Sequence, residues 1–108
     1  MYHLCFYVPE SHLAKLKTAL FDAGAGKIGA YDSCAWETKG RGQFRPLQGS
    51  SPFLGKVNTI EYVAEYRVEM VCDEDCIEAV LHRLMAVHPY ETPAYWVTQV
   101  KTLKDFAR

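Results

Sequence analysis

The nine residues His88-Pro-Tyr-Glu-Thr-Pro-Ala-Tyr-Trp96 decide the fold, because they hold the end of a helix, a turn and the start of a strand. Proline disfavours helical geometry in the residue before it, so a helix should end at His88. Pro93 then keeps the chain in the turn before the strand-forming residues Tyr95 and Trp96. The turn therefore fixes His88 and Glu91 where a helix ends and a strand begins.

The residues before this turn have the spacing of an amphipathic helix. Asp73 suits the N-cap, and two acidic residues follow it in the positions that favour a helix N-terminus. Apolar side chains then recur three and four residues apart, at Ile77, Val80, Leu81, Leu84 and Met85. This spacing predicts a helix that runs to the His88-Pro89 pair.

Alternating apolar and polar residues predict four strands, over 2–8, 31–39, 60–72 and 94–101. A first helix should start at Pro9-Glu10 and stop before Gly24, with its apolar face made by Leu13, Leu16, Leu20 and Ala23. Residues 40–58 are rich in glycine and proline, yet they are too many for a structureless connection. We therefore expect an irregular hairpin arm between the second and third strands.

The order of elements predicts one α+β domain over residues 1–108. It is a ferredoxin-like βαββαβ sandwich, with two helices on one face of a four-stranded antiparallel sheet. Since two helices cover only one face, the apolar residues left on the other face predict association between subunits.

Composition limits the classes of partner. The 108 residues are 49% hydrophobic and carry a net charge of −1, so nothing in the overall charge favours nucleic acid or an anionic membrane. No apolar run approaches the roughly 20 residues that cross a bilayer. The N-terminus does not resemble a signal peptide, so we expect a cytoplasmic protein whose four cysteines are reduced and mostly buried.

Four spaced motifs resemble the domain inserted in the Nif-three-like (YqfO-type) proteins, here as a stand-alone version. They are Gly24-Ala-Gly-Lys-Ile-Gly-Ala-Tyr-Asp-Ser-Cys34, Gly40-Arg-Gly-Gln-Phe-Arg-Pro46, Gly49-Ser-Ser-Pro-Phe-Leu-Gly55 and His88-Pro-Tyr-Glu-Thr-Pro-Ala94. The last is also similar to the helix-to-strand turn of the CutA divalent-cation tolerance proteins. The resemblance implies a fold shared with the PII signalling proteins and a homo-oligomer, with a trimer preferred over a dimer.

The resemblance does not carry a metal centre or a hydrolase activity to this chain. In full-length members the flanking domains supply the His, Asp and Glu ligands of a two-metal site. This chain also has Lys27 where the family's glycine motif usually has His.

His88 and Glu91 are the candidate metal ligands. An imidazole and a carboxylate on a rigid turn suit Zn²⁺, Cu²⁺ or Ni²⁺, although a structural zinc site needs four ligands. The structural alternative is that His88 caps the helix end while Glu91 accepts backbone hydrogen bonds in the turn. His12 and His82 fall outside the apolar stripes and should face solvent.

The candidate ligand-binding residues come from two glycine-containing segments and the turn. They are Gly24, Gly26, Lys27, Gly29, Arg41, Arg45 and Tyr90. Backbone N–H groups of the Gly24–Gly29 loop, together with Lys27, would cradle an anion; the alternative is a plain helix stop. Tyr90 has the alternative of a core or interface residue. The basic arm, residues 39–57, would meet a phosphate or an acidic partner, or would instead pack Phe44 and Phe53 across a subunit boundary.

The sequence therefore predicts a small binding or regulatory module for a divalent metal ion, a small anion or a protein partner. Its site would combine the Gly24–Gly29 loop with the His88–Glu91 turn. No residue has the pattern of a catalytic nucleophile. The alternatives are a minimal metal-assisted hydrolase with His88 in a site between subunits, and an interaction domain that uses the basic arm.

Overall fold

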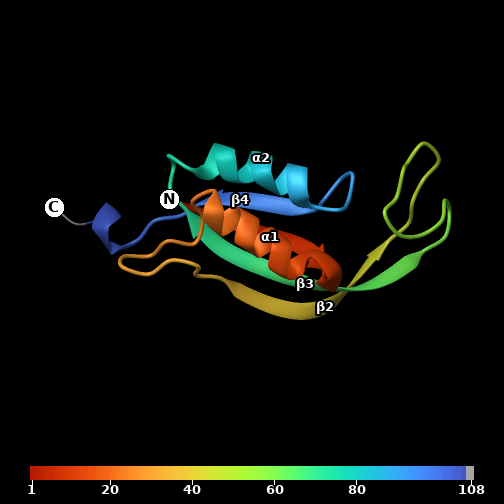
Figure 1. Cartoon of the computed structure of the whole chain (residues 1–108), viewed down its shortest axis with the longest axis horizontal. Helices are drawn as coiled ribbons and strands as arrows, with labels where there is room; N and C mark the ends of the chain where they lie inside the picture. The colour runs from red at the N-terminus through yellow and green to blue at the C-terminus, as the bar shows by residue number, and fades with distance from the viewer. Residues whose placement is uncertain (107–108) are drawn as a thin grey trace.

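The computed structural model describes residues 1–106 and contains one antiparallel sheet with two helices on one of its faces (Figure 1). The elements are β1 (Tyr2–Pro9), α1 (Glu10–Asp22), β2 (Trp36–Phe44), β3 (Glu61–Cys72), α2 (Ile77–Val87), β4 (Tyr95–Gln99) and the 3-10 turn η1 (Leu103–Asp105). The strands lie in the order β2-β3-β1-β4. The predicted ferredoxin-like plan is confirmed. The last two residues, 107–108, lie outside the described residues.

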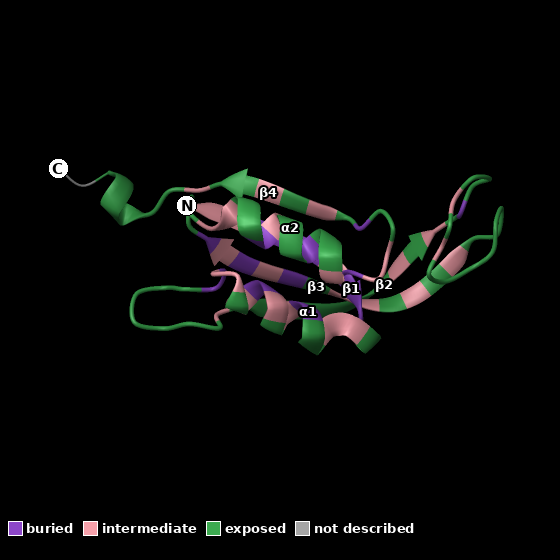
Figure 2. Cartoon of the chain, turned by 45° about the horizontal axis from the view of Figure 1, so that its top comes forward, coloured by how far each residue is buried: buried purple, intermediate pink, exposed green. Residues whose placement is uncertain are grey.

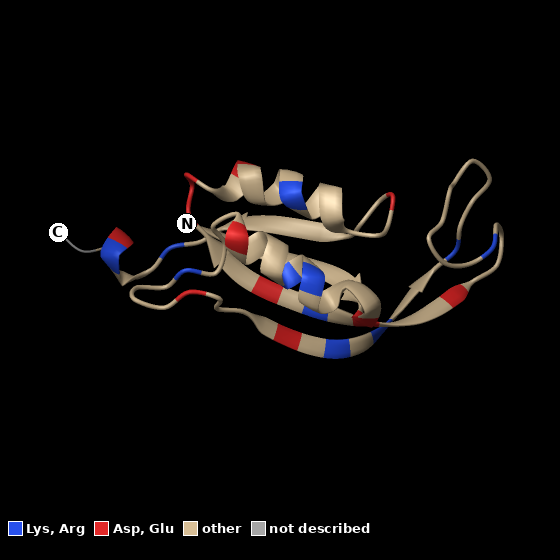
Figure 3. Cartoon of the chain, viewed as in Figure 1, with Lys and Arg blue, Asp and Glu red and all other residues tan. Residues whose placement is uncertain are grey.

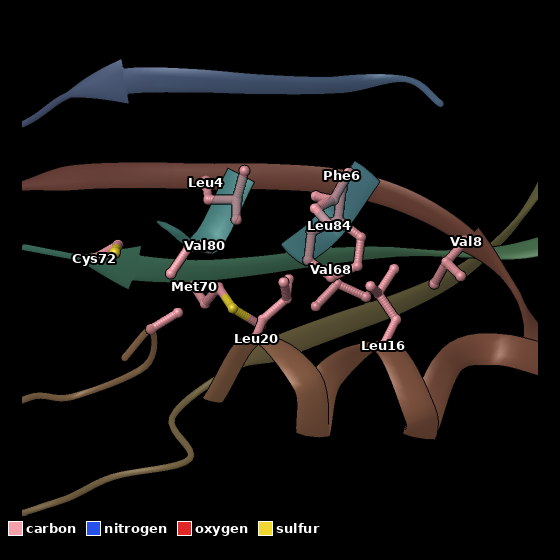
Figure 4. Packing of buried hydrophobic residues seen from close by; sticks show 11 residues of the cluster. Leu4, Phe6, Val8, Leu16, Leu20, Val68, Met70, Cys72, Val80 and Leu84 are labelled. Carbon is pink, nitrogen blue, oxygen red and sulfur yellow. The ribbon is translucent and has the colours of Figure 1, made fainter. Parts of the chain in front are cut away.

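The core fills the space between the sheet and the two helices (Figure 4). Alternate residues of β1 and β3 point toward the helices and meet the apolar stripes that the spacing predicts. The fully buried side chains are Leu4, Phe6, Val8, Leu16, Leu20, Val68, Val80 and Leu84. Burial of each such side chain stabilises the fold by roughly 1.5–3 kcal/mol.

The stop predicted for the first helix is confirmed in detail. Gly24 has φ +114°, its N–H donates to Phe21 O, and the N–H of Ala25 donates to Leu20 O. These two bonds satisfy the last carbonyls of α1 in the pattern of a Schellman motif. A Cβ on Gly24 would also lie 2.7 Å from Cys76 Sγ, so the helix end packs directly against the start of α2.

The start predicted for the second helix is wrong by about a turn. α2 begins at Ile77, and no side-chain hydrogen bond caps it. The carbonyl of Asp73, rather than its carboxylate, accepts the N–H groups of Cys76 and Ile77, each at 3.1 Å. Backbone bonds thus take the place of the predicted N-cap.

The predicted boundaries of the second strand are also wrong, because the strand begins at Trp36 and continues to Phe44. Before it, a bridge between Ile28 and Tyr31 and a left-handed Ser33 (φ 56°) hold the chain in a compact loop. At its other end the strand continues past residue 39, through Gly40 and Gly42. It pairs with β3 from Trp36↔Glu69 to Phe44↔Glu61.

The β2–β3 hairpin extends past the helices and makes the molecule long, 55 × 24 × 23 Å. Residues 45–60, which we call the arm loop, join the two strands at the far end and are largely exposed (Figure 2). This is the irregular hairpin arm expected between the second and third strands. Neither helix within residues 1–106 has the length and apolar character needed to cross a bilayer.

The four cysteines, which the sequence predicts to be mostly buried, divide evenly: Cys5 and Cys72 are buried, and Cys34 and Cys76 are half-buried. Cys5, Cys34, Cys72 and Cys76 are free thiols. Burial raises the pKa of Cys72 to about 11, with a further contribution from nearby Cys76. Since the thiolate is the reactive form, Cys72 is an inert core residue at neutral pH.

Candidate functional site

A cavity with mostly apolar walls lies where the arm loop meets the turn between α2 and β4. We call this cavity, about 250 Å³ in volume, the arm pocket. Four segments separated in the sequence line it: the end of β1, the end of β2 together with the arm loop, β3, and the turn. The lining residues are Tyr7, Gln43, Phe44, Pro46, Ser50, Pro52, Phe53, Leu54, Glu65, Tyr90, Glu91, Thr92 and Ala94.

His88 holds the turn against the end of β1. It is the C-cap of α2, where its N–H donates to Leu84 O, and its side chain is only 6% exposed. The Tyr90 N–H donates to Nδ1 of His88 at 3.1 Å, so Nε2 carries the proton and donates to Tyr7 O at 2.6 Å. Burial lowers the pKa of His88 below its ordinary value of 6.5, with the bond to Tyr7 acting against it. His88 is therefore a neutral structural imidazole at physiological pH.

Tyr90 and Glu65 form the polar part of the pocket wall. The Tyr90 hydroxyl donates to Glu65 Oε2 at 3.3 Å. Burial raises the pKa of Glu65 above its ordinary 4.5, and the bond from Tyr90 opposes that rise. Burial also raises the pKa of Tyr90 to about 12, with a contribution from the charge of Glu65. The pocket thus contains a half-buried carboxylate with one ordered hydrogen-bond donor.

Gly42 makes room for this carboxylate. Gly42 lies on β2, next to the strand that carries Glu65, and a Cβ added to Gly42 would overlap the Glu65 carboxylate. A glycine within a strand often marks such a close approach.

Aromatic rings line the rest of the pocket. The Tyr90 ring centroid lies 6.3 Å from that of Phe44, 6.2 Å from that of Phe53 and 4.9 Å from that of His88. Phe53 also receives the ring of His12, with centroids 5.5 Å apart, so the expectation that His12 faces solvent is wrong. His82, with its side chain 81% exposed, faces solvent as predicted.

Glu91 ties the arm loop to the turn. Its Oε1 accepts the backbone N–H of Ser51 at 2.9 Å, across 40 residues of sequence. The structural alternative for Glu91 was a carboxylate that accepts backbone hydrogen bonds within the turn, whereas this donor lies in the arm loop.

The electrostatic character of the pocket is acidic. Among its lining residues are two carboxylates, Glu65 and Glu91, and no lysine or arginine. The two candidate arginines lie elsewhere: Arg41 stacks over the ring of Tyr62 at 4.7 Å, and Arg45 is exposed at the start of the arm loop. Over the whole molecule, positive and negative residues are interspersed (Figure 3).

The predicted combined site does not form within one chain. The Gly24–Gly29 loop lies where β3 ends, since Gly26 N–H donates to Val71 O, whereas His88 bonds to Tyr7 at the other end of the sheet. The N–H groups of Gly24, Ala25, Gly26 and Ile28 all donate to backbone carbonyls. Lys27, Gly29 and residues 30–32 line a shallow depression at this loop, separate from the arm pocket.

The metal-binding prediction for His88 and Glu91 remains a prediction. Both His88 nitrogens are engaged in hydrogen bonds, and one Glu91 oxygen is engaged with Ser51. Within residues 1–106 no group of three or more His, Cys, Asp or Glu side chains is placed to hold a metal ion.

Of the candidate residues, the structure brings Tyr90 and Glu91 into the pocket. It adds Glu65, Phe44 and Phe53, which the sequence did not mark as ligand-binding. The sequence pointed to Glu65 only indirectly, through Gly42. A glycine within a strand often leaves space for a group from a neighbouring segment.

Comparisons with known proteins agree with this architecture. No family model matches the chain. The chain is 49% identical over 89 residues to a GTP cyclohydrolase 1 type 2 homolog of Mycobacterium leprae, covering 82% of the chain and 23% of that protein. It is 41% identical over 98 residues to the protein of the same name from Bacillus subtilis, covering 91% of the chain and 26% of that protein. The chain thus spans about a quarter of the length of these relatives.

Superposition on solved structures shows that this chain also shares its fold with known proteins. A Bacillus cereus protein related to NIF3 superposes with a TM-score of 0.80 and 32% identity, over 94% of this chain and 26% of that one. CutA from Xylella fastidiosa superposes with a TM-score of 0.68 over 97% of this chain and 88% of its own. The PII-like protein CutA from Nostoc gives 0.68 over 98% and 89%. At 20% and 16% identity, these two show the fold alone.

Proposed function

Because this chain is homologous to one domain of the NIF3-type proteins and has the CutA and PII-like fold, we propose that it is a binding or regulatory module whose ligand occupies the arm pocket. The observation that carries the proposal is the construction of the pocket. Its walls come from four distant segments, and two contacts from the turn, Glu91 to Ser51 and Tyr90 to Phe53, hold the arm loop over it.

This construction supports a regulatory role. A ligand in the pocket touches the arm loop on one side and the end of β1 on the other. The arm loop also exposes Leu47 and Val57, which do not line the pocket, so a change in the position of the loop would change an apolar surface. Occupancy of the pocket would therefore be transmitted to a surface that another molecule can contact.

The experiment that tests the proposal is a screen of the full chain against small molecules of mixed charge, read by amide NMR. The reporters are Ser51 and Tyr90, whose N–H groups bond to Glu91 and His88. Saturable shifts at both amides with at least one compound, weakened by Phe53→Ala, support the proposal. Phe106→Ala is the control, since Phe106 is an exposed aromatic residue outside the pocket lining. Absence of any binder, or binding only at other amides, would overturn it.

Metal binding by His88 and Glu91 is a finer prediction with a separate test. To coordinate an ion, His88 would have to release Tyr7 or Tyr90, which would loosen the end of β1. Titration with Zn²⁺, Cu²⁺ or Ni²⁺ should then shift the Tyr90 amide, and His88→Gln should abolish the shift. The alternative of a metal-assisted hydrolase, whose site would lie between subunits, stays a prediction.

We also propose that the chain forms a homo-oligomer in the cytoplasm through the sheet face that lacks helices. A row of residues crosses that face in register, Trp36, Glu69, Cys5 and Trp96. The two tryptophans at its ends are 68% and 60% exposed, which supports burial against another copy. Analytical ultracentrifugation tests the assembly, and a monomer at micromolar concentration would contradict it.

A further inference from the structure

We infer that the arm pocket selects a small organic cation, a protonated amine with an aromatic or apolar body. The inference rests on the proposed function, because it names the ligand class of that same pocket. It follows from three features of the wall: its charge, its rings and the free acceptor positions of its carboxylates.

The charge of the wall favours a cation. Glu65 and Glu91 are the charged residues of the lining, and the lining contains no lysine or arginine to neutralise them. Arg41 is held over Tyr62 instead. A cation entering the pocket would pair with a half-buried carboxylate, where charge attraction is stronger than in bulk water, whereas an anion would meet repulsion from both sides.

The rings of the wall favour the same ligand. Phe44 and Phe53 both approach Tyr90, so three aromatic faces or edges surround one space. Aromatic faces attract ammonium groups through their quadrupole, and they also pack against apolar bodies. Pro46 and Pro52 add further apolar surface from the arm loop. The ammonium group and the apolar body of such an amine would therefore both contact complementary groups of the pocket wall.

The carboxylate geometry leaves room for the ammonium group. Oε2 of Glu65 accepts one bond from Tyr90. An ionised carboxylate has about four lone-pair positions, so Glu65 can accept further N–H donors. At about 250 Å³ the pocket is slightly below the usual range of roughly 300–1,000 Å³ for ligand sites, which restricts the ligand to a small molecule.

The test uses three probes of nearly equal shape and different charge: phenethylamine, phenethyl alcohol and phenylacetate. Each is titrated into the full chain while the amides of Ser51 and Tyr90 are followed by NMR. We expect phenethylamine to bind at these amides at least about tenfold more tightly than the alcohol, and phenylacetate to bind most weakly of the three. Glu65→Gln should remove most of the preference for the amine. Glu78→Gln should leave it unchanged, because Glu78 is exposed on α2.

Equal or tighter binding of the alcohol or of phenylacetate would overturn the inference while leaving the arm pocket as a binding site. Binding of phenethylamine only at amides outside the pocket, or no binding of any probe, would also overturn it. The screen against small molecules of mixed charge tests the proposed function independently of this inference. The probe series on the unaltered chain is decisive even if Glu65→Gln fails to fold.

Discussion

The imidazole of His88 donates a hydrogen bond to the backbone carbonyl of Tyr7 over 2.6 Å and thereby fastens the end of α2 to the end of β1. Its other nitrogen accepts the N–H of Tyr90, so one neutral side chain fixes three segments. The turn His88-Pro-Tyr-Glu91 therefore has a structural role. The pocket forms because this turn is held in place.

The protonation of His88 should set the acid stability of the fold. Burial lowers the folded-state pKa below the ordinary 6.5, so the unfolded chain binds a proton more readily than the folded one. Stability should therefore be fully present above about pH 6.5 and fall as the pH decreases from there toward the folded-state pKa. Urea unfolding followed by tryptophan fluorescence at several pH values measures this slope.

A pair of variants isolates His88 as the cause. His88→Gln should cost about 1–3 kcal/mol at neutral pH, because one buried bond is lost, and it should flatten the acid slope. His82→Gln is the control, since His82 is exposed. If the slope survives in His88→Gln, another group is responsible for it.

Gly42→Ala should destabilise the hairpin because its new Cβ would overlap the Glu65 carboxylate. Because the atoms that it meets belong to the end of a flexible side chain, Glu65 can move, and the cost should be below about 1.5 kcal/mol, chiefly the lost bond from Tyr90 to Glu65. Gly40→Ala is the matched control, two residues away on the same strand, where an added Cβ meets nothing within 4 Å. It should be neutral or slightly stabilising.

In a Glu65→Ala background, Gly42→Ala should cost almost no stability, since the two side chains no longer compete for the same space. Chemical denaturation of all four proteins completes the cycle. Additive effects would show that Gly42 is required for another reason.

Glu91→Ala should release the arm loop without unfolding the core. The bond from the Ser51 N–H is exposed and lies far from the helices, so its loss should cost less than about 1.5 kcal/mol. The sensitive measurement is hydrogen exchange at Ser51, which should become faster, while the core amides of Leu4 and Phe6 keep their protection. Glu61→Ala, on the same hairpin but outside the pocket lining, is the control.

The parts of the fold that depend on local rules could be predicted from the sequence. The alternation of β3, the spacing of α2 and the glycine stop after α1 each follow from a single segment, and Pro89 ends α2 as its geometry requires. The end of β2 could not be predicted in this way. Its glycines look like loop residues until the partner strand is known, and Gly42 is explained only by Glu65.

The site was harder to predict for the same reason. Tyr90 and Glu91 stand in a marked motif, but Glu65 occupies an ordinary polar position of an alternating strand. Its burial results from the arm loop and the turn, which meet it from about 10 and 25 residues away in sequence. The glycine loop at Gly24 leaves few N–H groups for an anion, because those of Gly24 and Ala25 complete the helix end and that of Gly26 donates to Val71 O.

The affinity for phenethylamine should depend on pH with a definite sign. Burial raises the pKa of Glu65 above 4.5 in the free protein, and a bound ammonium group would favour the charged carboxylate and lower that pKa again. The amine remains protonated across the range of the experiment. Affinity should therefore be constant near neutral pH and weaken as the pH falls through the raised pKa of Glu65, by up to tenfold for each pH unit below it. NMR titrations at a series of pH values measure this curve. In Glu65→Gln the curve should be flat over that range. A wild-type affinity that instead increases on acidification would mean that a neutral Glu65, acting as a donor, is the form that binds.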